Sequence, residues 1–323
     1  MRTPSSFGTG LLLALLSAAS FGVAGALAKG LLEHGWTAGA AVTARIGVAA
    51  LVLVVPGALA LRGRWDVLRT NTGLVTLYGV LAVAGAQLCY FYAVSYLEVS
   101  LALLLEYTAP VAVVVWWWLR HGHRPSRTTL LGAAIATAGL ALVLDVVGSG
   151  ATLEVTGVLW ALGAMTGAAT YFIISADADN GLPGITLAAG GLVVGGLVLG
   201  TAGLVGLLPM TASTDAVTYA GVAVPWYVPV LTLGLVAGAV AYVSGILAGR
   251  RLGSRLASFV ALAEVLCALL FAWALLGEMP RPVQLIGGLL VLLGVVVVKV
   301  GEDAGSATVE PLPEDDAPVS LAP

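Results

Sequence analysis

The chain has 323 residues, of which 59% are hydrophobic and only 10% are charged. Soluble domains carry about 25% charged residues, so this composition argues against a soluble enzyme, a nucleic-acid-binding protein and a disordered protein. The net charge of only −3 says nothing about partners, and the 42 glycines are typical of helices that pack closely in lipid. Cys89 and Cys267 lie inside apolar runs and could form at most one bridge, so the chain has no disulfide framework.

Ten apolar runs are each about 20 residues long, the length that crosses a bilayer as a helix. They are continuous rather than alternating, which favours helices over the strands of a barrel. A cleaved signal peptide is the alternative for the first run, but the run continues past the cleavage-like stretch 24–26. The predicted helices cover residues 10–32, 38–60, 73–95, 99–119, 129–147, 156–177, 185–208, 226–248, 256–276 and 282–300.

The distribution of Lys and Arg predicts that both chain ends are cytoplasmic. With the N-terminus inside, eleven of the fourteen basic residues fall on the inner side and only Arg281 on the outer side. Lys29 and Arg45 fall within predicted helices. The eleven are Arg2, Arg62, Arg64, Arg69, Arg120, Arg124, Arg127, Arg250, Arg251, Arg255 and Lys299.

The chain divides into two halves and a tail, with expected boundaries at 1–148, 149–300 and 301–323. The halves align with a shift of 155 residues, so five helices make one repeat. Because five is odd, the second repeat enters the membrane from the opposite side, an arrangement typical of secondary transporters. The acidic, proline-rich tail is predicted to be a disordered cytoplasmic segment. The most telling aligned pairs are Trp118 and Trp273, Gly122 and Gly277, and Pro125 and Pro280.

The predicted architecture is therefore an all-α polytopic membrane protein of ten transmembrane helices in two inverted five-helix repeats, N-in and C-in. Several stretches resemble the EamA-like family of the drug/metabolite transporter superfamily. Gly22, Lys29 and Arg45 also stand where that family often has Gly, Lys and Arg. The resembling stretches are 103–110, 234–242, 248–253, 275–278 and 287–288.

The resemblance implies a transporter of the cell membrane, an exporter or permease of small metabolites such as amino acids. Two departures weaken any transfer of a substrate from relatives. The first repeat has Arg120-His-Gly-His where the second has Leu275-Leu-Gly-Glu, and the second has Glu264-Val where the first has Ala109-Pro. The inverted repeats predict alternating access, because the two halves can exchange conformations. A proton or a counter-substrate is a candidate coupling partner.

Ionisable residues inside a membrane are functional candidates because they are costly to bury. Glu106 lies about 12 Å below the outer end of its helix, and Glu264 about 13 Å from the inner end of its own. Both therefore approach the middle of a core that is about 30 Å thick. Pro110 adds a second polar group at position 106: it has no N–H to donate to the carbonyl of Glu106, so that carbonyl is a free acceptor. We expect a site for a cation, an ammonium group or a proton; the alternative is a structural ion pair with Lys29 or Arg45.

Other residues complete the expected site. Arg45 lies about seven residues into its helix and is a candidate partner of Glu106 or of a substrate carboxylate. Lys29 shares a helix face with Glu33, and its alternative role is to reach the interface. Three further candidates are Gln87 and Tyr242, which are repeat partners, and Tyr107 beside Glu106.

No residue pattern predicts a cofactor, a metal site or a catalytic motif. The expected partners are a small-molecule substrate and the lipid bilayer, with no nucleic acid; the oligomeric state stays open. A membrane-embedded enzyme acting on lipid is the alternative function, but it needs a catalytic cluster at the interface. A membrane protein that transports nothing would not need paired carboxylates in inverted repeats.

Overall fold

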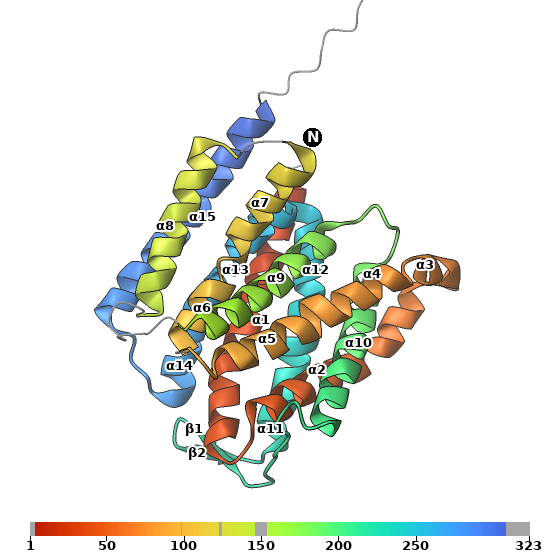
Figure 1. Cartoon of the computed structure of the whole chain (residues 1–323), viewed down its shortest axis with the longest axis vertical. Helices are drawn as coiled ribbons and strands as arrows, with labels where there is room; N and C mark the ends of the chain where they lie inside the picture. The colour runs from red at the N-terminus through yellow and green to blue at the C-terminus, as the bar shows by residue number, and fades with distance from the viewer. Residues whose placement is uncertain (1–3, 98, 123–124, 146–153, 308–323) are drawn as a thin grey trace, which may run out of the picture.

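The computed structural model describes residues 4–97, 99–122, 125–145 and 154–307. Within these residues, nine helical stretches are long and apolar enough to cross a membrane. The fifth predicted span, 129–147, forms the shorter apolar helix α8, whose 17 residues give a length of about 25 Å. Nine long helices and one shorter helix therefore stand where the sequence predicts ten (Figure 1).

The first half consists of eight α-helices and one π-helical segment. These elements are α1 (Pro4–Glu33), α2 (Ala38–Ala60), α3 (Trp65–Thr70), α4 (Thr72–Leu77), the π-helical segment η1 (Tyr78–Gly85), α5 (Ala86–Ala93), α6 (Val99–Glu106), α7 (Ala109–His121) and α8 (Arg127–Val143).

The second half repeats this order and adds a hairpin. Its elements are α9 (Val155–Ala176), α10 (Gly184–Leu204), β1 (Val217–Tyr219), β2 (Val222–Val224), α11 (Tyr227–Gly234), the π-helical segment η2 (Leu235–Val240), α12 (Ala241–Leu252), α13 (Ser254–Ala261), α14 (Ala263–Leu276) and α15 (Pro282–Ala307).

Irregularities in the two halves fall at equivalent positions. With the shift of 155 residues, η2 coincides with the last six residues of η1. The break between α6 and α7 at Tyr107 coincides with Leu262, between α13 and α14. Gly122 and Gly277 both end a helix in the left-handed region, with φ of 71° and 74°. The internal repeat is therefore visible in the backbone as well as in the sequence.

Each half packs its first helix against the other half. α1 lies against α12 and α14, and α9 lies against η1, α5, α6 and α7. The hydroxyl of Ser17 on α1 donates to the carbonyl of Ala241 at 2.8 Å. Gly22 lets α1 approach α14 closely, because a Cβ there would lie 2.9 Å from the carbonyl oxygen of Glu264. The two repeats are thus interlocked.

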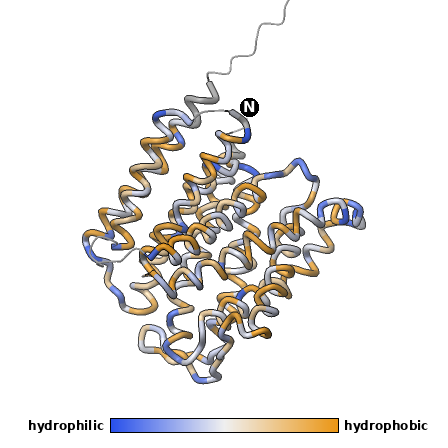
Figure 2. Tube along the Cα trace, viewed as in Figure 1, coloured by the Kyte–Doolittle hydropathy of each residue, from blue (hydrophilic) through white to orange (hydrophobic). Residues whose placement is uncertain are grey.

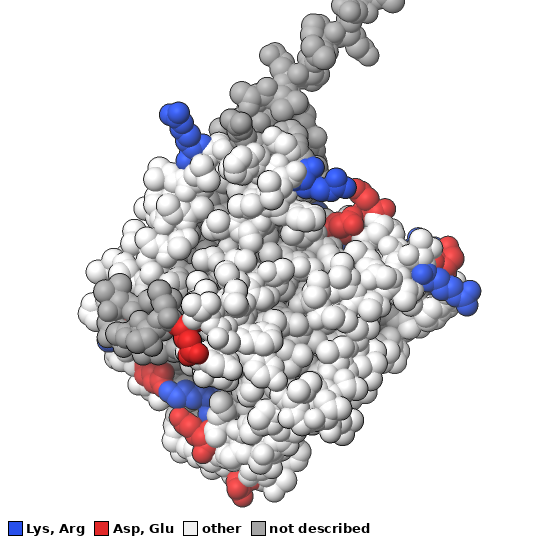
Figure 3. Space-filling view, in the orientation of Figure 1, with Lys and Arg blue, Asp and Glu red and all other residues white. Residues whose placement is uncertain are grey.

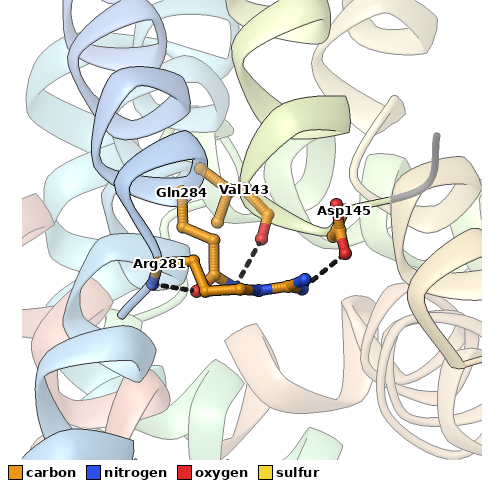
Figure 4. A network of polar contacts seen from close by, with 4 residues as sticks. All are labelled: Val143, Asp145, Arg281 and Gln284. Carbon is orange, nitrogen blue, oxygen red and sulfur yellow. Dashed lines mark hydrogen bonds and ion pairs between the residues drawn. The ribbon is translucent and has the colours of Figure 1, made fainter. Parts of the chain in front are cut away.

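α8 and α15 pack on each other beside the other helices (Figure 1). Gly139 and Gly287 meet at this contact, and a Cβ on either would lie 2.6 Å from the carbonyl oxygen of the other. At one end of the pair, Arg281 forms an ion pair with Asp145 at 2.5 Å, and Gln284 donates to the carbonyl of Val143 at 3.0 Å (Figure 4).

The bundle has two charged rims. We call the end where α1 begins and α15 ends the terminal rim, and the end that carries β1 and β2 the hairpin rim. Between them, the face in Figure 3 shows a broad band without Lys, Arg, Asp or Glu. Hydrophobic residues run along most of the helices (Figure 2). A surface without charged side chains suits contact with lipid, where such side chains are costly. The helices also satisfy their own backbone hydrogen bonds there.

The structure corrects three details of the expected fold. The architecture is not purely α-helical, because β1 and β2 pair in an antiparallel hairpin. α8 ends at Val143 rather than 147, since the chain turns at Asp145 with φ of 52°. α15 continues to Ala307, past the expected start of the tail at 301, because the first proline of the tail comes only at 311. The expected boundary at 148/149 and tail residues 308–323 lie outside the described residues.

The hairpin ties the ends of two helices together. The Tyr219 hydroxyl donates to the carbonyl of Leu27 on α1 at 2.7 Å, and the N–H of Ala220 donates to the carbonyl of Leu275 on α14 at 2.8 Å. Burial, with a smaller contribution from the Glu33 carboxylate, raises the pKa of Tyr219 to about 12. The hydroxyl therefore stays protonated and remains a donor at neutral pH.

Candidate functional site

The two intramembrane glutamates meet at the two breaks in the helices. Glu106 is the last residue of α6, and Glu264 is the second residue of α14. The hydroxyl of Tyr107 donates to Oε1 of Glu264 at 3.0 Å, which joins the two breaks directly. The carboxylates of Glu106 and Glu264 also interact electrostatically with each other. Side chains from two half-helices thus converge near the middle of the spans.

The first break follows from local chemistry. Pro110 lies in the first turn of α7 and has no N–H for the carbonyl of Glu106. The hydroxyl of Thr108 donates back to the carbonyl of Leu105 at 2.6 Å, and the N–H of Val111 donates to the carbonyl of Thr108 at 2.8 Å. These bonds close α6 and begin α7 within two residues.

The second break has no proline. The N–H of Leu262 donates to the carbonyl of Phe259 at 3.1 Å, and the N–H of Val265 donates to the carbonyl of Leu262 at 3.2 Å. These tighter i to i+3 bonds replace the α-helical pattern at Leu262. Nothing in the sequence around Leu262 predicts the break, except that it aligns with Tyr107 in the first repeat.

Arg45 brings a positive charge to the glutamates. Its guanidinium interacts electrostatically with Glu106, with Glu264 and with the hydroxyl of Tyr242. The Nε atom of Arg45 is buried and makes no hydrogen bond among the described residues. Within the same part of the chain, no direct ion pair joins Arg45 to either carboxylate. The guanidinium therefore keeps a donor that a ligand can use.

Aromatic rings pack beside the charged groups. The ring of Tyr242 is only 3% exposed and lies edge-on to Phe21, with centroids 5.2 Å apart. Tyr171 packs edge-on to Tyr242 at 5.7 Å, and the Arg45 guanidinium lies 6.0 Å from the centre of Phe21. The sequence singled out Tyr242 as a site candidate but not Phe21. Their contacts join α1, α9 and α12, which no local pattern relates.

Two predicted site residues lie elsewhere. Lys29 forms an ion pair with Glu278 at the hairpin rim and not with Glu106. Both side chains are about half exposed, so the pair contributes at most about 1 kcal/mol. Lys29 lines a cavity of about 520 Å³ together with Glu33 and the hairpin turn. Gln87 lines a narrow crevice with residues of α2 and α10, including Gly39.

The structure thus brings together five of the seven predicted residues. We call this set the glutamate-pair site; it consists of Arg45, Glu106, Tyr107, Tyr242 and Glu264. When both glutamates are ionised, the three charged groups sum to one negative charge. Among the described residues, no three His, Cys, Asp or Glu side chains gather in a metal-binding arrangement.

Comparisons with known proteins agree with the two-repeat architecture. A family model described as the EamA-like transporter family matches residues 8–145 and again residues 155–300. No curated protein is significantly similar to the chain. One solved crystal structure shares the fold with a TM-score of 0.71 and 19% sequence identity, over 93% of this chain and 98% of the other.

Proposed function

Because the chain belongs to the EamA-like transporter family, we propose that this multi-pass membrane protein moves a small polar metabolite across the cell membrane by alternating access around the glutamate-pair site. In this proposal it is a secondary transporter that works as an exporter, with both termini cytoplasmic. The observation that carries the proposal is the meeting of Glu106 and Glu264 at two helix breaks in inverted repeats. Broken helices near the bilayer midplane commonly line transporter sites.

The charges of the site indicate what it binds. When both glutamates are ionised, the surplus of one negative charge favours a ligand with a protonated amine. The free Nε of Arg45 suits a carboxylate on the same ligand, because a guanidinium binds carboxylates well. Amino acids and related zwitterions fit both requirements. In the proposed transport cycle, a proton or a counter-substrate binds the glutamates when the substrate has left.

Uptake into proteoliposomes tests the role of the glutamates. A panel of labelled amino acids and amines is offered to the purified protein with and without a pH gradient. We expect Glu106→Gln to keep the fold, since it keeps the shape of the side chain, and to lower the initial rate by about tenfold or more. Glu264→Gln is expected to have a smaller effect, because no proline frees a carbonyl beside it.

Exposed Glu154 provides the matched control. Glu154→Gln removes the same charge outside the spans and should transport like the parent. Rates are measured between about pH 5 and pH 8, together with thermal stability. Parental transport by Glu106→Gln at every pH would refute its role in binding or coupling. If Glu106→Gln unfolds while Glu264→Gln stays stable and active, Glu106 is a structural residue.

A further inference from the structure

The two rims of the bundle are not packed alike, although the repeats are. At the terminal rim, α12 packs on α9, and α13 packs on both α7 and α9. The repeat counterparts of these contacts lie at the hairpin rim: α5 on α1, α6 on α14 and α6 on α1. Within the described residues, none of these three pairs packs to a comparable extent. The helices of the terminal rim are therefore packed more closely than their counterparts at the hairpin rim.

Specific contacts close the terminal rim. The hydroxyl of Tyr171 on α9 lies directly over Gly245 on α12, where it fills the space that a Cβ would take. One turn further, a Cβ on Gly249 would lie 3.4 Å from the backbone of Ser175. Between α7 and α13, the indole N–H of Trp117 donates to the hydroxyl of Ser254 at 2.6 Å.

The corresponding surfaces at the hairpin rim are uncovered. Gly25 on α1 is exposed, and a Cβ placed on it would have no atom within 4 Å. At the start of α6, Val99 is 55% exposed.

Glycine contacts fix which residues correspond. Gly10 packs on Leu252, and Gly157 packs on Leu97. These two contacts relate α1 to α9 by a shift of 147 and α5 to α12 by a shift of 155. The same shifts relate Tyr171 to Ala24, next to Gly25, and Gly245 to Tyr90. The tyrosine–glycine contact of one rim thus has its mirror in Tyr90 opposite Ala24–Gly25.

We propose that Tyr171 and Tyr90 are two opposed gating residues. In the state described here, Tyr171 closes the terminal rim against Gly245 while the hairpin rim is open. In the opposite state, Tyr90 closes the hairpin rim against Ala24–Gly25, and Tyr171 leaves Gly245. The hydroxyl of Tyr90 interacts electrostatically with Glu106, and the hydroxyl of Tyr171 interacts electrostatically with Glu264. This inference rests on the proposed alternating access.

Disulfide cross-linking measures the two gates without any substrate. Both native cysteines are first replaced by serine, and two cysteine pairs are then introduced separately: Tyr171→Cys with Gly245→Cys, and Tyr90→Cys with Gly25→Cys. In purified protein in lipid nanodiscs, we expect the first pair to oxidise about tenfold faster than the second. Equal rates, or a faster second pair, would overturn the proposal.

A bulky residue at the terminal rim tests whether the gates are coupled. Gly249→Trp cannot fit against Ser175, so it should open that rim and raise the oxidation rate of the Tyr90→Cys, Gly25→Cys pair by about tenfold. Gly249→Leu, a smaller change, should raise it less and serves if the tryptophan variant fails to fold. Gly200→Trp is the control, since Gly200 has no atom within 4 Å of a Cβ.

The outcome is independent of the substrate. If neither Gly249 variant changes the rate of the hairpin-rim pair, the two tyrosines do not gate alternately. That result would leave transport through the glutamate-pair site untouched. Conversely, Glu106→Gln could transport like the parent while the Gly249 variants raise the cross-linking rate at the hairpin rim. That result would refute the role of Glu106 and support the two gating tyrosines.

Discussion

At the scale of single residues, the two glutamates are not equivalent. Glu264 accepts a hydrogen bond from the Tyr107 hydroxyl, which fixes one carboxylate oxygen. Within the described residues, no protein donor holds the carboxylate of Glu106 in the same way. The carboxylate of Glu106 can therefore bind a ligand without first giving up a protein hydrogen bond. This difference supports the larger effect expected for Glu106→Gln.

Arg45 is the residue whose loss should be most informative. Arg45→Ala removes the only positive charge of the glutamate-pair site, while the glutamates can still become neutral by taking up protons. We expect uptake to be abolished with normal expression, measured in proteoliposomes and by size-exclusion chromatography. Arg45→Lys keeps the charge but not the planar fork and should recover little of the uptake. Normal transport by Arg45→Ala would make Arg45 an interface residue without a role in binding.

At the scale of elements, the α8–α15 contact depends on the absence of side chains. A Cβ on Gly139 would lie 2.6 Å from the carbonyl oxygen of Gly287 and 2.6 Å from the backbone nitrogen of Val291. Backbone atoms cannot rotate away as a side chain can, so the whole helix must shift. The pair therefore resembles other membrane helices that meet through small residues.

Gly139→Ala is expected to destabilise the protein by about 1–3 kcal/mol through this overpacking. The measurement is the thermal unfolding midpoint in detergent. Gly200→Ala is the matched control, because Gly200 lies within α10 and a Cβ there meets no atom within 4 Å. The control should be unchanged or slightly more stable, since alanine favours a helix. An unshifted midpoint for Gly139→Ala would show that α8 and α15 can separate freely.

The sequence predicts these elements well where the signal is local. Apolar runs place the helices, and Pro110 marks the first break through its missing N–H. The break at Leu262 has no such local mark. The partner of Lys29 was also not predictable, because Glu278 lies at the other end of the chain and only packing of α1 on α14 brings it near. Gln87 aligns with Tyr242, yet it lines a crevice with residues of α2 and α10.

At the scale of the whole molecule, orientation is the property that most needs a direct measurement. Eleven Lys and Arg residues fall on the side of the chain ends and only one on the other side, which predicts that the terminal rim is cytoplasmic. In a protein without its native cysteines, Ser320→Cys in the tail should react with an impermeant thiol reagent only after the cells are opened. Ala212→Cys, exposed in the loop before β1, should react in intact cells. Labelling of the tail from outside would reverse the orientation.

The interlocking of the repeats has a consequence for biosynthesis. α1 is made first, but its packing partners α12 and α14 follow only after more than half of the chain. Until then Ser17 and Gly22 lack their packing partners, so α1 lies in the bilayer without the helices that cover it in the complete protein. The first half, made alone, lacks α12 and α14, the two helices that cover α1 most extensively. A ribosome that stops after the first repeat therefore leaves a substrate for membrane quality control rather than half a working transporter.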